Sequence, residues 1–283
     1  MAYDAARGQV VLFGGTSADS YFNNFNDTWV WDGSNWTQKW PVNSPPAHTA
    51  HSMAYDAARG QVVLFGGHNG NSDFNDTWVW DGSNWTQKWP VNSPPLRAYQ
   101  AMAYDAARGQ VVLFGGHNGN SYFNDTWVWD GNNWMQKSPA SSPAARNYHA
   151  MAYDAARGQV VLFGGRDMST SYPDTWVWDG NDWTQKWPAS SPTPRVRPAM
   201  VYDAARGEVV VFGGALMGPF GWYGDTWVWV WNGTNWAQKN PASSPTLRVY
   251  HAMAYDAARA QTVLFGGSGM SVPYILDDTW VWP

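Results

Sequence analysis

The chain contains no cysteine, so disulfides, thiolate nucleophiles and thiolate metal ligands are all excluded. Glutamate occurs once, at Glu208, which excludes a pair of glutamates tuned for acid–base catalysis. Charged residues make up only 14% of the 283 residues, with a net charge of -5. The few lysines are spread evenly along the chain, so no basic stripe is expected and nucleic-acid binding is disfavoured.

Long apolar runs are also missing. No run approaches the roughly 18 residues needed to cross a bilayer, so membrane insertion is not expected. Met1 opens directly on repeat sequence without a charged or apolar leader region, so we expect any secretion signal to lie outside this chain. The compartment stays open, and an extracellular location would require that a leader has been removed. What is abundant is apolar material, with 44% hydrophobic and 17% aromatic residues, which is typical of a globular chain.

Internal repetition dominates the sequence. The motif "MAYD", or "MVYD" in one case, recurs at intervals of 49 to 53 residues and divides the chain into six units. Together the units form a single domain over residues 1–283. Their boundaries are 1–52, 53–101, 102–150, 151–199, 200–252 and 253–283.

Each unit reads as four short β-strands. Strand A ("HAMAYD") is followed by a tight turn ("AARG"), strand B ("VVLFGG"), a variable loop, strand C ("DTWVWDG") and strand D ("NWTQK"). The alternation in "TWVW" and the β-branched run of "VVLF" favour pleated strands, while Gly, Asn and Pro separate them. A period near 50 residues suits such four-stranded units, which predicts an all-β fold.

These motifs resemble the kelch repeat. The resemblance rests on the double glycine that ends strand B, on an aromatic separated from a tryptophan by six residues, as Trp29 is from Trp36, and on an arginine before strand A. It recurs six times and covers the whole chain. The resemblance implies a six-bladed β-propeller of four-stranded antiparallel blades. It says little about function, because kelch propellers include enzymes, adaptors and ligand-binding proteins.

The repeated tryptophans have a structural interpretation. Blades of a propeller are wedges that widen outward, and large rings fill such wedges. Trp29 and Trp31 should share one face of strand C because they are two residues apart, with Trp36 beside them on strand D. Each buried ring stabilises the fold by roughly 2 to 3 kcal/mol if its indole N–H finds a partner. A sugar-stacking platform is the rival interpretation.

Other repeated polar residues also have structural explanations. The aspartate in "DAARG" is expected to cap a turn in which the glycine is left-handed, and a ring of six metal-binding aspartates is the alternative. The "NDT" and "NWT" triplets match the glycosylation pattern, and we interpret them as structural. The six histidines show no spacing typical of metal ligands or of a catalytic triad, so neither a metal nor a cofactor is expected.

The units differ mainly in their loops. In an up-and-down blade, the B–C loops and the D–A connections share one face of the propeller, which makes that face the candidate ligand surface. Half of the B–C loops are polar, such as "HNGNSDFN", and half are apolar, such as "ALMGPFGWYG". The candidate ligand-binding residues are Arg166, Arg195, Arg197, Trp222, Tyr223, Phe220, Met217, His149, His251, His68, His117, Tyr148 and Tyr250.

Three functional hypotheses remain open. The first is a non-catalytic module that binds a protein segment or a glycan on this face. The second is a sugar-processing, mutarotase-like enzyme at the channel mouth, with Arg195, Arg197, His149, His251 and nearby tyrosines as its polar groups. The third is a recently amplified or engineered array kept for its architecture. A deep concave site would favour the enzyme, and a shallow face would favour the binding module.

The sixth unit ends after strand C, which leaves 23 expected strands and three in the sixth blade. We expect the ring to close through side-chain packing between the first and sixth blades, and this seam to be the least stable interface. The outer edge of residues 278–282 would then be open to strand addition and to edge-to-edge association with another chain.

Overall fold

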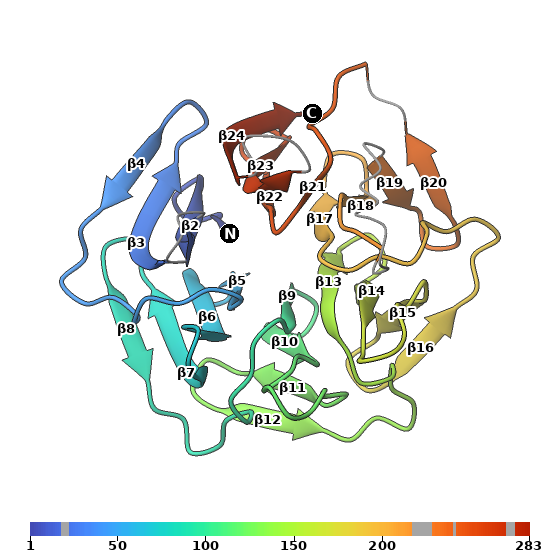
Figure 1. Ribbon diagram of the computed structural model, residues 1–283, viewed down its shortest axis with the longest axis horizontal. Coiled ribbons are helices and arrows are strands. Elements are labelled where there is room, and N and C mark those ends of the chain that lie inside the picture. Colours follow the sequence, from blue (N-terminus) through green and yellow to red (C-terminus); the bar gives the residue numbers. More distant parts are fainter. Residues whose placement is uncertain (18–22, 217–227, 240–241, 270–274) are drawn as a thin grey trace.

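The protein forms a six-bladed β-propeller in which every blade is an antiparallel sheet. The computed structural model describes residues 1–17, 23–216, 228–239, 242–269 and 275–283. The blades surround a central channel, with the first strand of each blade innermost and the last one outermost (Figure 1). Among the described residues there is no helix that could span a membrane.

The strands follow the repeat units closely. The first three blades contain β1 (Ala2–Asp4), β2 (Gln9–Thr16), β3 (Asn24–Trp31), β4 (Trp36–Lys39), β5 (Ser52–Asp56), β6 (Gln61–His68), β7 (Asp73–Trp80), β8 (Trp85–Lys88), β9 (Ala101–Asp105), β10 (Gln110–Phe114), β11 (Thr126–Trp129) and β12 (Trp134–Lys137). The last three contain β13 (Asn147–Asp154), β14 (Gln159–Arg166), β15 (Thr175–Trp178), β16 (Trp183–Lys186), β17 (Ala199–Asp203), β18 (Glu208–Phe212), β19 (Val228–Trp231), β20 (Trp236–Lys239), β21 (Arg248–Val249), β22 (Ala252–Asp256), β23 (Gln261–Gly269) and β24 (Ile275–Trp282).

The sixth sheet differs from the other five. It holds four strand segments, and the total is therefore 24 rather than the expected 23. The additional strand is not a strand D: β21 and β22 both pair with β23, at its two ends, while β24 pairs with the other edge of β23. In the described part of the chain no strand lies outside β24 (Figure 1).

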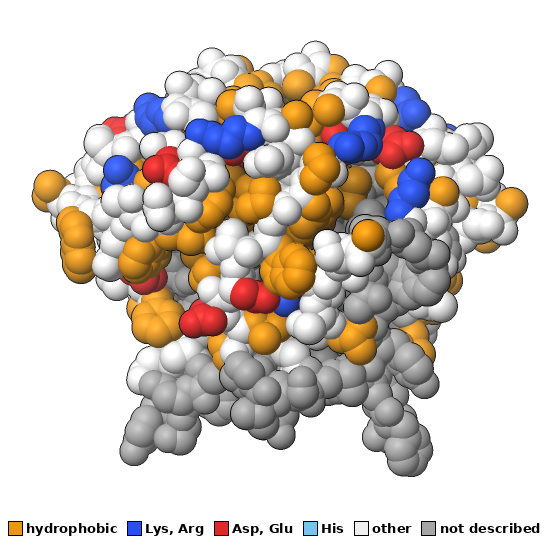
Figure 2. Space-filling model, turned by 90° about the horizontal axis from the view of Figure 1, so that it is seen from above, with side chains coloured by type: hydrophobic (Ala, Val, Ile, Leu, Met, Phe, Trp, Pro, Cys, Tyr) orange, Lys and Arg blue, Asp and Glu red, His pale blue; other side chains and the backbone are white. Residues whose placement is uncertain are grey.

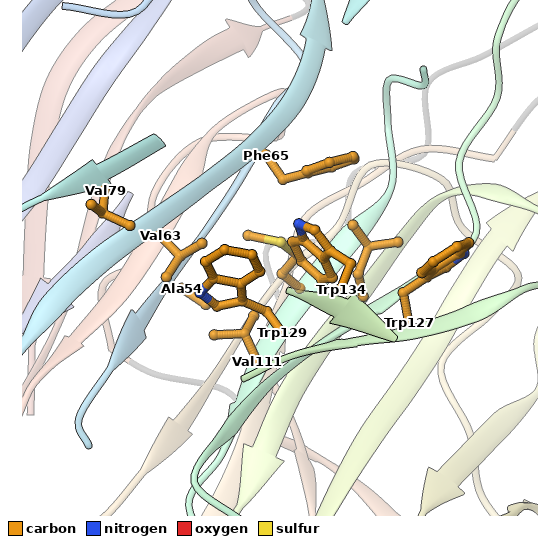
Figure 3. Close-up of a cluster of buried hydrophobic side chains, with 10 residues drawn as sticks. Ala54, Val63, Phe65, Val79, Val111, Trp127, Trp129 and Trp134 are labelled. Carbon is orange, nitrogen blue, oxygen red and sulfur yellow. The ribbon is translucent and has the colours of Figure 1, made fainter. Parts of the chain in front are cut away.

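The core lies between the blades, as the tryptophan pattern predicts. In one such interface Trp127, Trp129 and Trp134 of the third blade pack against Phe65 and its neighbours in the second blade (Figure 3). The three rings therefore share one face of their sheet, as expected from their spacing. The ring of Trp134 lies 5.1 Å from that of Phe65 in an edge-to-face arrangement.

Two of the three indole groups in a blade find hydrogen-bond partners. Trp127 Nε1 donates to Asp125 Oδ2 at 2.7 Å, and Trp134 Nε1 donates to Thr77 Oγ1 of the preceding blade at 2.9 Å. The third, Trp129 Nε1, is buried without a partner in the described residues. The condition that the indole N–H finds a partner is therefore not met at this position.

In the fifth and sixth blades the aspartate of this turn caps backbone N–H groups as expected, whereas in the first four blades its Oδ1 atom is buried without a partner in the described residues and Oδ2 pairs with the arginine of the turn. Asp203 Oδ1 accepts hydrogen bonds from the N–H groups of Ala205 and Arg206, and Arg206 forms an ion pair with Asp203 Oδ2 at 2.8 Å. Gly207 is left-handed with φ of +68°. Within the described ranges, no three His, Asp or Glu side chains gather where they could hold a metal ion.

The ring closes through contacts between the first and sixth blades. Trp36 Nε1 donates to Thr279 Oγ1 at 2.9 Å, and the ring of Trp36 lies 5.3 Å from Phe265. The N–H of Ala258 donates to the phenolic oxygen of Tyr3 at 3.0 Å. Equivalent tryptophan–threonine bonds join the first five blades to one another, so closure uses the ordinary contacts between blades.

Candidate functional site

The double glycines bring the D–A connections to the channel mouth. A Cβ on Gly66 would lie 2.7 Å from the Arg97 carbonyl oxygen, and a Cβ on Gly67 would lie 2.7 Å from the Thr49 carbonyl oxygen. Both glycines also have positive φ, so a side chain at either position would both clash with a carbonyl oxygen and strain the backbone. The N–H of Gly67 donates to the Arg97 carbonyl at 2.9 Å. This close approach fixes the backbone that forms the mouth.

The arginine before strand A is a structural clamp. Arg146 is fully buried, and its two terminal nitrogens donate to Asp174 at 2.6 and 2.9 Å. It also donates to the Gly164 carbonyl and stacks on Tyr172 at 4.1 Å. Arg195, a candidate ligand residue, occupies the same position: it is buried and donates to the Gly213 carbonyl at 3.1 Å. The structure therefore places Arg195 inside the scaffold rather than on the binding face.

The residue two positions after each clamp position has a left-handed backbone, although it is not a glycine. The φ angles at this position range from +58° to +61°, a conformation that costs of order 1 kcal/mol for a residue with a side chain. Neighbouring turns are joined by hydrogen bonds, from the N–H of Tyr99 to the Ala50 carbonyl, from Tyr148 to Tyr99 and from Arg197 to Tyr148. The residues at this position are Ala50, Tyr99, Tyr148, Arg197 and Tyr250.

This geometry gathers aromatic rings and guanidinium groups at the channel mouth. The Cζ atom of Arg197 lies 4.3 Å from the ring centre of Tyr148 and 4.0 Å from that of Tyr250. Arg166 approaches Tyr148 at 5.9 Å, and the rings of Tyr99 and Tyr148 are 4.3 Å apart. Tyr250 is 52% exposed, so the group is accessible from solvent. We call these five residues the rim cluster.

Tyr99 and Tyr250 of the rim cluster stay protonated at neutral pH. Burial raises the pKa of Tyr250 to about 12, although Arg197 acts in the opposite direction. The pKa of Tyr99 is also raised, chiefly by burial and then by the neighbouring Tyr148. Both phenols are therefore hydrogen-bond donors, and the two guanidinium groups of the cluster supply positive charge. Such a group suits a ligand that presents carboxylate or carbonyl oxygens beside an apolar surface.

His68 and His117 lie beside the rim cluster, at the start of their B–C loops. The Nδ1 atom of His68 accepts a hydrogen bond from the N–H of Gly70, and that of His117 accepts one from Gly119, both at 3.1 Å. Each imidazole is thus held by its own loop. Burial lowers the pKa of His117 and raises that of the neighbouring Asp73. Asp73 was not identified from the sequence.

His149 and His251 do not lie at the channel mouth. Both are buried between blades, where their rings pack edge-on against Phe114 and Phe212 at 5.5 Å. Burial, assisted by a nearby arginine, lowers the pKa of each to about 3, so both are neutral at pH 7. The expectation that they serve as polar groups of a surface site is not supported by this placement.

The other sequence candidates lie outside the described residues. They are Met217, Phe220, Trp222 and Tyr223.

The channel holds a small cavity of about 150 Å³, lined by the "MAY" residues of the innermost strands. Small-molecule sites in proteins usually have volumes of about 300 to 1,000 Å³. The volume is low for a substrate pocket, and it favours recognition at the mouth over chemistry inside the channel.

Three tryptophans are exposed on the outer wall of the ring. Trp40, Trp89 and Trp187 follow strand D in the first, second and fourth blades and are 81 to 83% exposed. The third blade has Ser138 at this position, so the propeller does not require an aromatic residue here. They are the only repeated tryptophans of the described residues that resemble a platform rather than core.

The sequence also matches a family model over nearly its whole length. The model describes the KLHDC2/KLHL20/DRC7 Kelch-repeats domain, and it matches residues 1–142 and 132–282. The chain belongs to the kelch-repeat family. No curated protein matches the chain significantly. The double glycines, clamp arginines and blade tryptophans of this kelch propeller all serve the scaffold, so its specificity must come from positions that the scaffold leaves free.

Tyr99 is the rim residue that sequence reasoning missed in this kelch chain. It lies two residues after Arg97, as Tyr148 lies two residues after Arg146. Aligning the D–A connections on the clamp arginine would have revealed it. Its left-handed backbone could not have been found, because no glycine or asparagine marks the position.

Proposed function

We propose that this kelch propeller is a non-catalytic interaction module that binds a segment of a partner protein at the channel mouth. The observation that carries the proposal is the rim cluster, in which Arg197 stacks between Tyr148 and Tyr250 on left-handed turns. Strained backbone that presents partly exposed aromatic and arginine side chains is typical of recognition surfaces. The repeated scaffold holds these side chains rigidly, which lowers the entropy lost on binding.

The ligand chemistry follows from the groups present. Arg166 and Arg197 provide two guanidinium groups, and the neighbouring phenols donate hydrogen bonds. Asp73 is the acidic group that faces His68 and His117 nearby. A partner segment with an acidic side chain next to an apolar one satisfies both the charge and the ring faces.

A glycan is the second candidate ligand, and one observation favours it. Trp40, Trp89 and Trp187 present their indole rings to solvent on the outer wall. Exposed rings at repeated positions can stack on apolar sugar faces, as they can on apolar protein surfaces. These rings lie in three different blades and share no pocket, so the rim cluster gives the stronger argument.

The enzyme hypothesis loses support from the placement of its residues. Arg195, His149 and His251 are engaged inside the scaffold, which leaves Arg197 and the tyrosines without a basic partner among the groups named for catalysis. A general base must lie within hydrogen-bond reach of its substrate.

The proposal can be tested with a displayed library of random linear peptides selected on the wild-type protein. Enriched peptides should bind at least tenfold more weakly to a Tyr148→Ala, Arg197→Ala, Tyr250→Ala variant. Alanine is suitable because Ala50 already occupies the same left-handed position with φ of +58°. The melting temperature should change by only a few degrees, because these side chains lie at the mouth and not between blades.

Met135→Ala is a matched control, since Met135 is 57% exposed on the outer strand of the third blade. It should leave peptide affinity unchanged. Equal affinity of the rim variant and the wild type would refute the proposal. Glycan-array binding that depends on Trp40, Trp89 and Trp187 would replace the proposal with the second candidate.

A further inference from the structure

The B–C loops of the second and third blades share the sequence "HNGNS", at residues 68–72 and 117–121. A side-chain amide that precedes a glycine is open to attack by the next backbone nitrogen, because glycine has no side chain to hinder the approach. Each loop begins at a bridge to a D–A connection, so both lie on the face that carries the rim cluster. The reactivity of these asparagines depends on the groups that surround each amide.

The amide carbonyl of Asn69 is polarised by its own loop. Asn69 Oδ1 accepts hydrogen bonds from the N–H of Asn71 at 3.0 Å and from the N–H of Ser72 at 2.9 Å. Asn118 Oδ1 accepts the two equivalent bonds at 3.2 and 2.9 Å. These bonds hold the side-chain amide beside the intervening residue, Gly70. The two N–H groups also stabilise the negative charge that develops on Oδ1 when a nucleophile adds to Cγ.

A histidine is held against the backbone nitrogen that would attack. His68 Nδ1 accepts a hydrogen bond from the N–H of Gly70 at 3.1 Å, and His117 Nδ1 accepts one from Gly119 at the same distance. A ring nitrogen that accepts a hydrogen bond carries no proton, so the proton of each neutral imidazole is on Nε2. A neutral imidazole within hydrogen-bond reach of a proton is positioned to remove it as a general base.

We propose that Asn69 and Asn118 are sites of self-catalysed conversion to aspartate, with His68 and His117 as the general bases. His68 Nδ1 takes the proton of the Gly70 N–H while that nitrogen forms a bond to Asn69 Cγ. The tetrahedral intermediate then breaks its Cγ–Nδ2 bond, and the imidazolium returns the proton, so that Nδ2 leaves as ammonia. Water opens the resulting five-membered imide on either side of its nitrogen and leaves aspartate or isoaspartate.

The fourth blade has an aspartate where the reaction would form one. Asp167 stands at the position of Asn69 and Asn118, and its Oδ1 accepts bonds from the N–H groups two and three residues further on at 2.8 and 2.7 Å. A hydrogen bond from Tyr172, followed by the bonds from these N–H groups, lowers the pKa of Asp167 to about 2. A carboxylate therefore fits this turn, and each conversion adds one negative charge to the face that carries the rim cluster. The reaction needs only the chain and water, so it does not depend on the proposed function.

The fifth blade provides a matched site without the base. Asn232 precedes Gly233 in the C–D turn, and Asn232 Oδ1 accepts hydrogen bonds from the N–H groups of Thr234 and Asn235 at 3.0 and 2.9 Å. The residue before Asn232 is Trp231, where the two B–C loops have histidine. Asn232 therefore shares the glycine and the polarised carbonyl with the two candidate sites but lacks their imidazole.

Conversion can be measured on freshly purified full chain kept at pH 7.5 for several weeks. Peptide mapping by mass spectrometry counts aspartate and isoaspartate at each position. Anion exchange follows the added charge, because the wall of the ring that Figure 2 shows carries few charged side chains. Asn69 and Asn118 should convert about tenfold faster than Asn232, since general-base catalysis contributes at least this much. In the urea-unfolded chain, where no imidazole is held at the nitrogen, the three rates should approach one another.

His68→Ala is the critical variant, because Asn118 stays intact in the same molecule and reports on the fold. Conversion at Asn69 should slow about tenfold while conversion at Asn118 is unchanged. Equal rates at the three asparagines of the folded protein, or no conversion at Asn69 and Asn118 within that time, would overturn the inference. An unchanged rate at Asn69 in His68→Ala, or equal slowing at Asn69 and Asn118, would overturn it as well.

Discussion

Replacing His48 by arginine should stabilise the second blade, because this blade lacks the clamp found in others. Arg97 binds Asp125 through two nitrogens at 2.6 and 2.8 Å and also donates to the Gly115 carbonyl at 2.9 Å. His48 holds the same position before strand A of the second blade and is fully buried. Neither of its ring nitrogens makes a hydrogen bond in the described residues.

The magnitude follows from Asp76, the counterpart of Asp125. Its Oδ1 atom is buried without a partner in the described residues, and burial raises its pKa. Hydrogen bonds to charged groups contribute about 1.5 to 3 kcal/mol each, but burying a guanidinium group costs several kcal/mol. We therefore expect His48→Arg to increase the free energy of unfolding by about 1 to 2 kcal/mol. The reverse change, Arg146→His, should cost about 3 to 5 kcal/mol because it leaves Asp174 unpaired.

Urea unfolding at pH 7.5 measures both free energies, and carbon-detected NMR measures the pKa of Asp76. In the variant this pKa should fall from its raised value to below the usual value for aspartate, because a guanidinium group replaces a neutral imidazole. A loss of stability in His48→Arg, or an unchanged pKa of Asp76, would refute the clamp as an explanation.

Three further predictions follow from the scaffold. Ala260 is left-handed with φ of +53°, at a position where the other blades have glycine, so Ala260→Gly should add about 1 kcal/mol to the free energy of unfolding. Gly60→Ala, whose Cβ would lie in open space, should lower the free energy of unfolding by a similar amount. Two changes of the same sign would contradict the strain argument. The folded pKa of His149 lies near 3, below the unfolded value of about 6.5, so its stabilising contribution is complete above pH 7 and is lost as pH falls towards 3, by up to about 1.4 kcal/mol per pH unit. His149→Gln, which copies Gln100 at the same position before the third blade, should reduce the slope of unfolding free energy against pH by one proton. Extending the chain after Trp282 with "DGSNWTQK" should raise the melting temperature, because it covers the outer edge of β24 and adds a tryptophan next to the fifth blade, and an unchanged melting temperature in differential scanning calorimetry would contradict this.

The propeller could be predicted because its determinants are local and repeated. Alternation in "TWVW" places Trp127 and Trp129 on one face, and the structure confirms this face as the interface between blades. The double glycines were expected to end strand B, but β2, β6, β14 and β23 run through them and only β10 and β18 end before them. What the glycines allow is the approach of the D–A connection, which lies within 2.7 Å of a Cβ on Gly66. Both signals depend only on residue type and period.

The site could be predicted only in part, because burial of polar residues depends on distant segments. Arg195 and Arg197 are two residues apart and looked equivalent in sequence, yet one is a buried clamp and the other belongs to the rim cluster. His149 looked like a surface group, but the adjacent blade covers it. Tyr99 escaped notice because its left-handed backbone is imposed by the neighbouring turns and not by its own residue type.

The most direct test of the proposed function is a hydrogen-exchange footprint of a library-selected peptide bound to the wild-type protein. The account predicts slowed exchange in residues 97–100, 146–150, 195–198 and 248–251, which surround the rim cluster, and no such protection in the Tyr148→Ala, Arg197→Ala, Tyr250→Ala variant. Protection confined to the outer wall around Trp40, Trp89 and Trp187, with the rim unchanged, would contradict it.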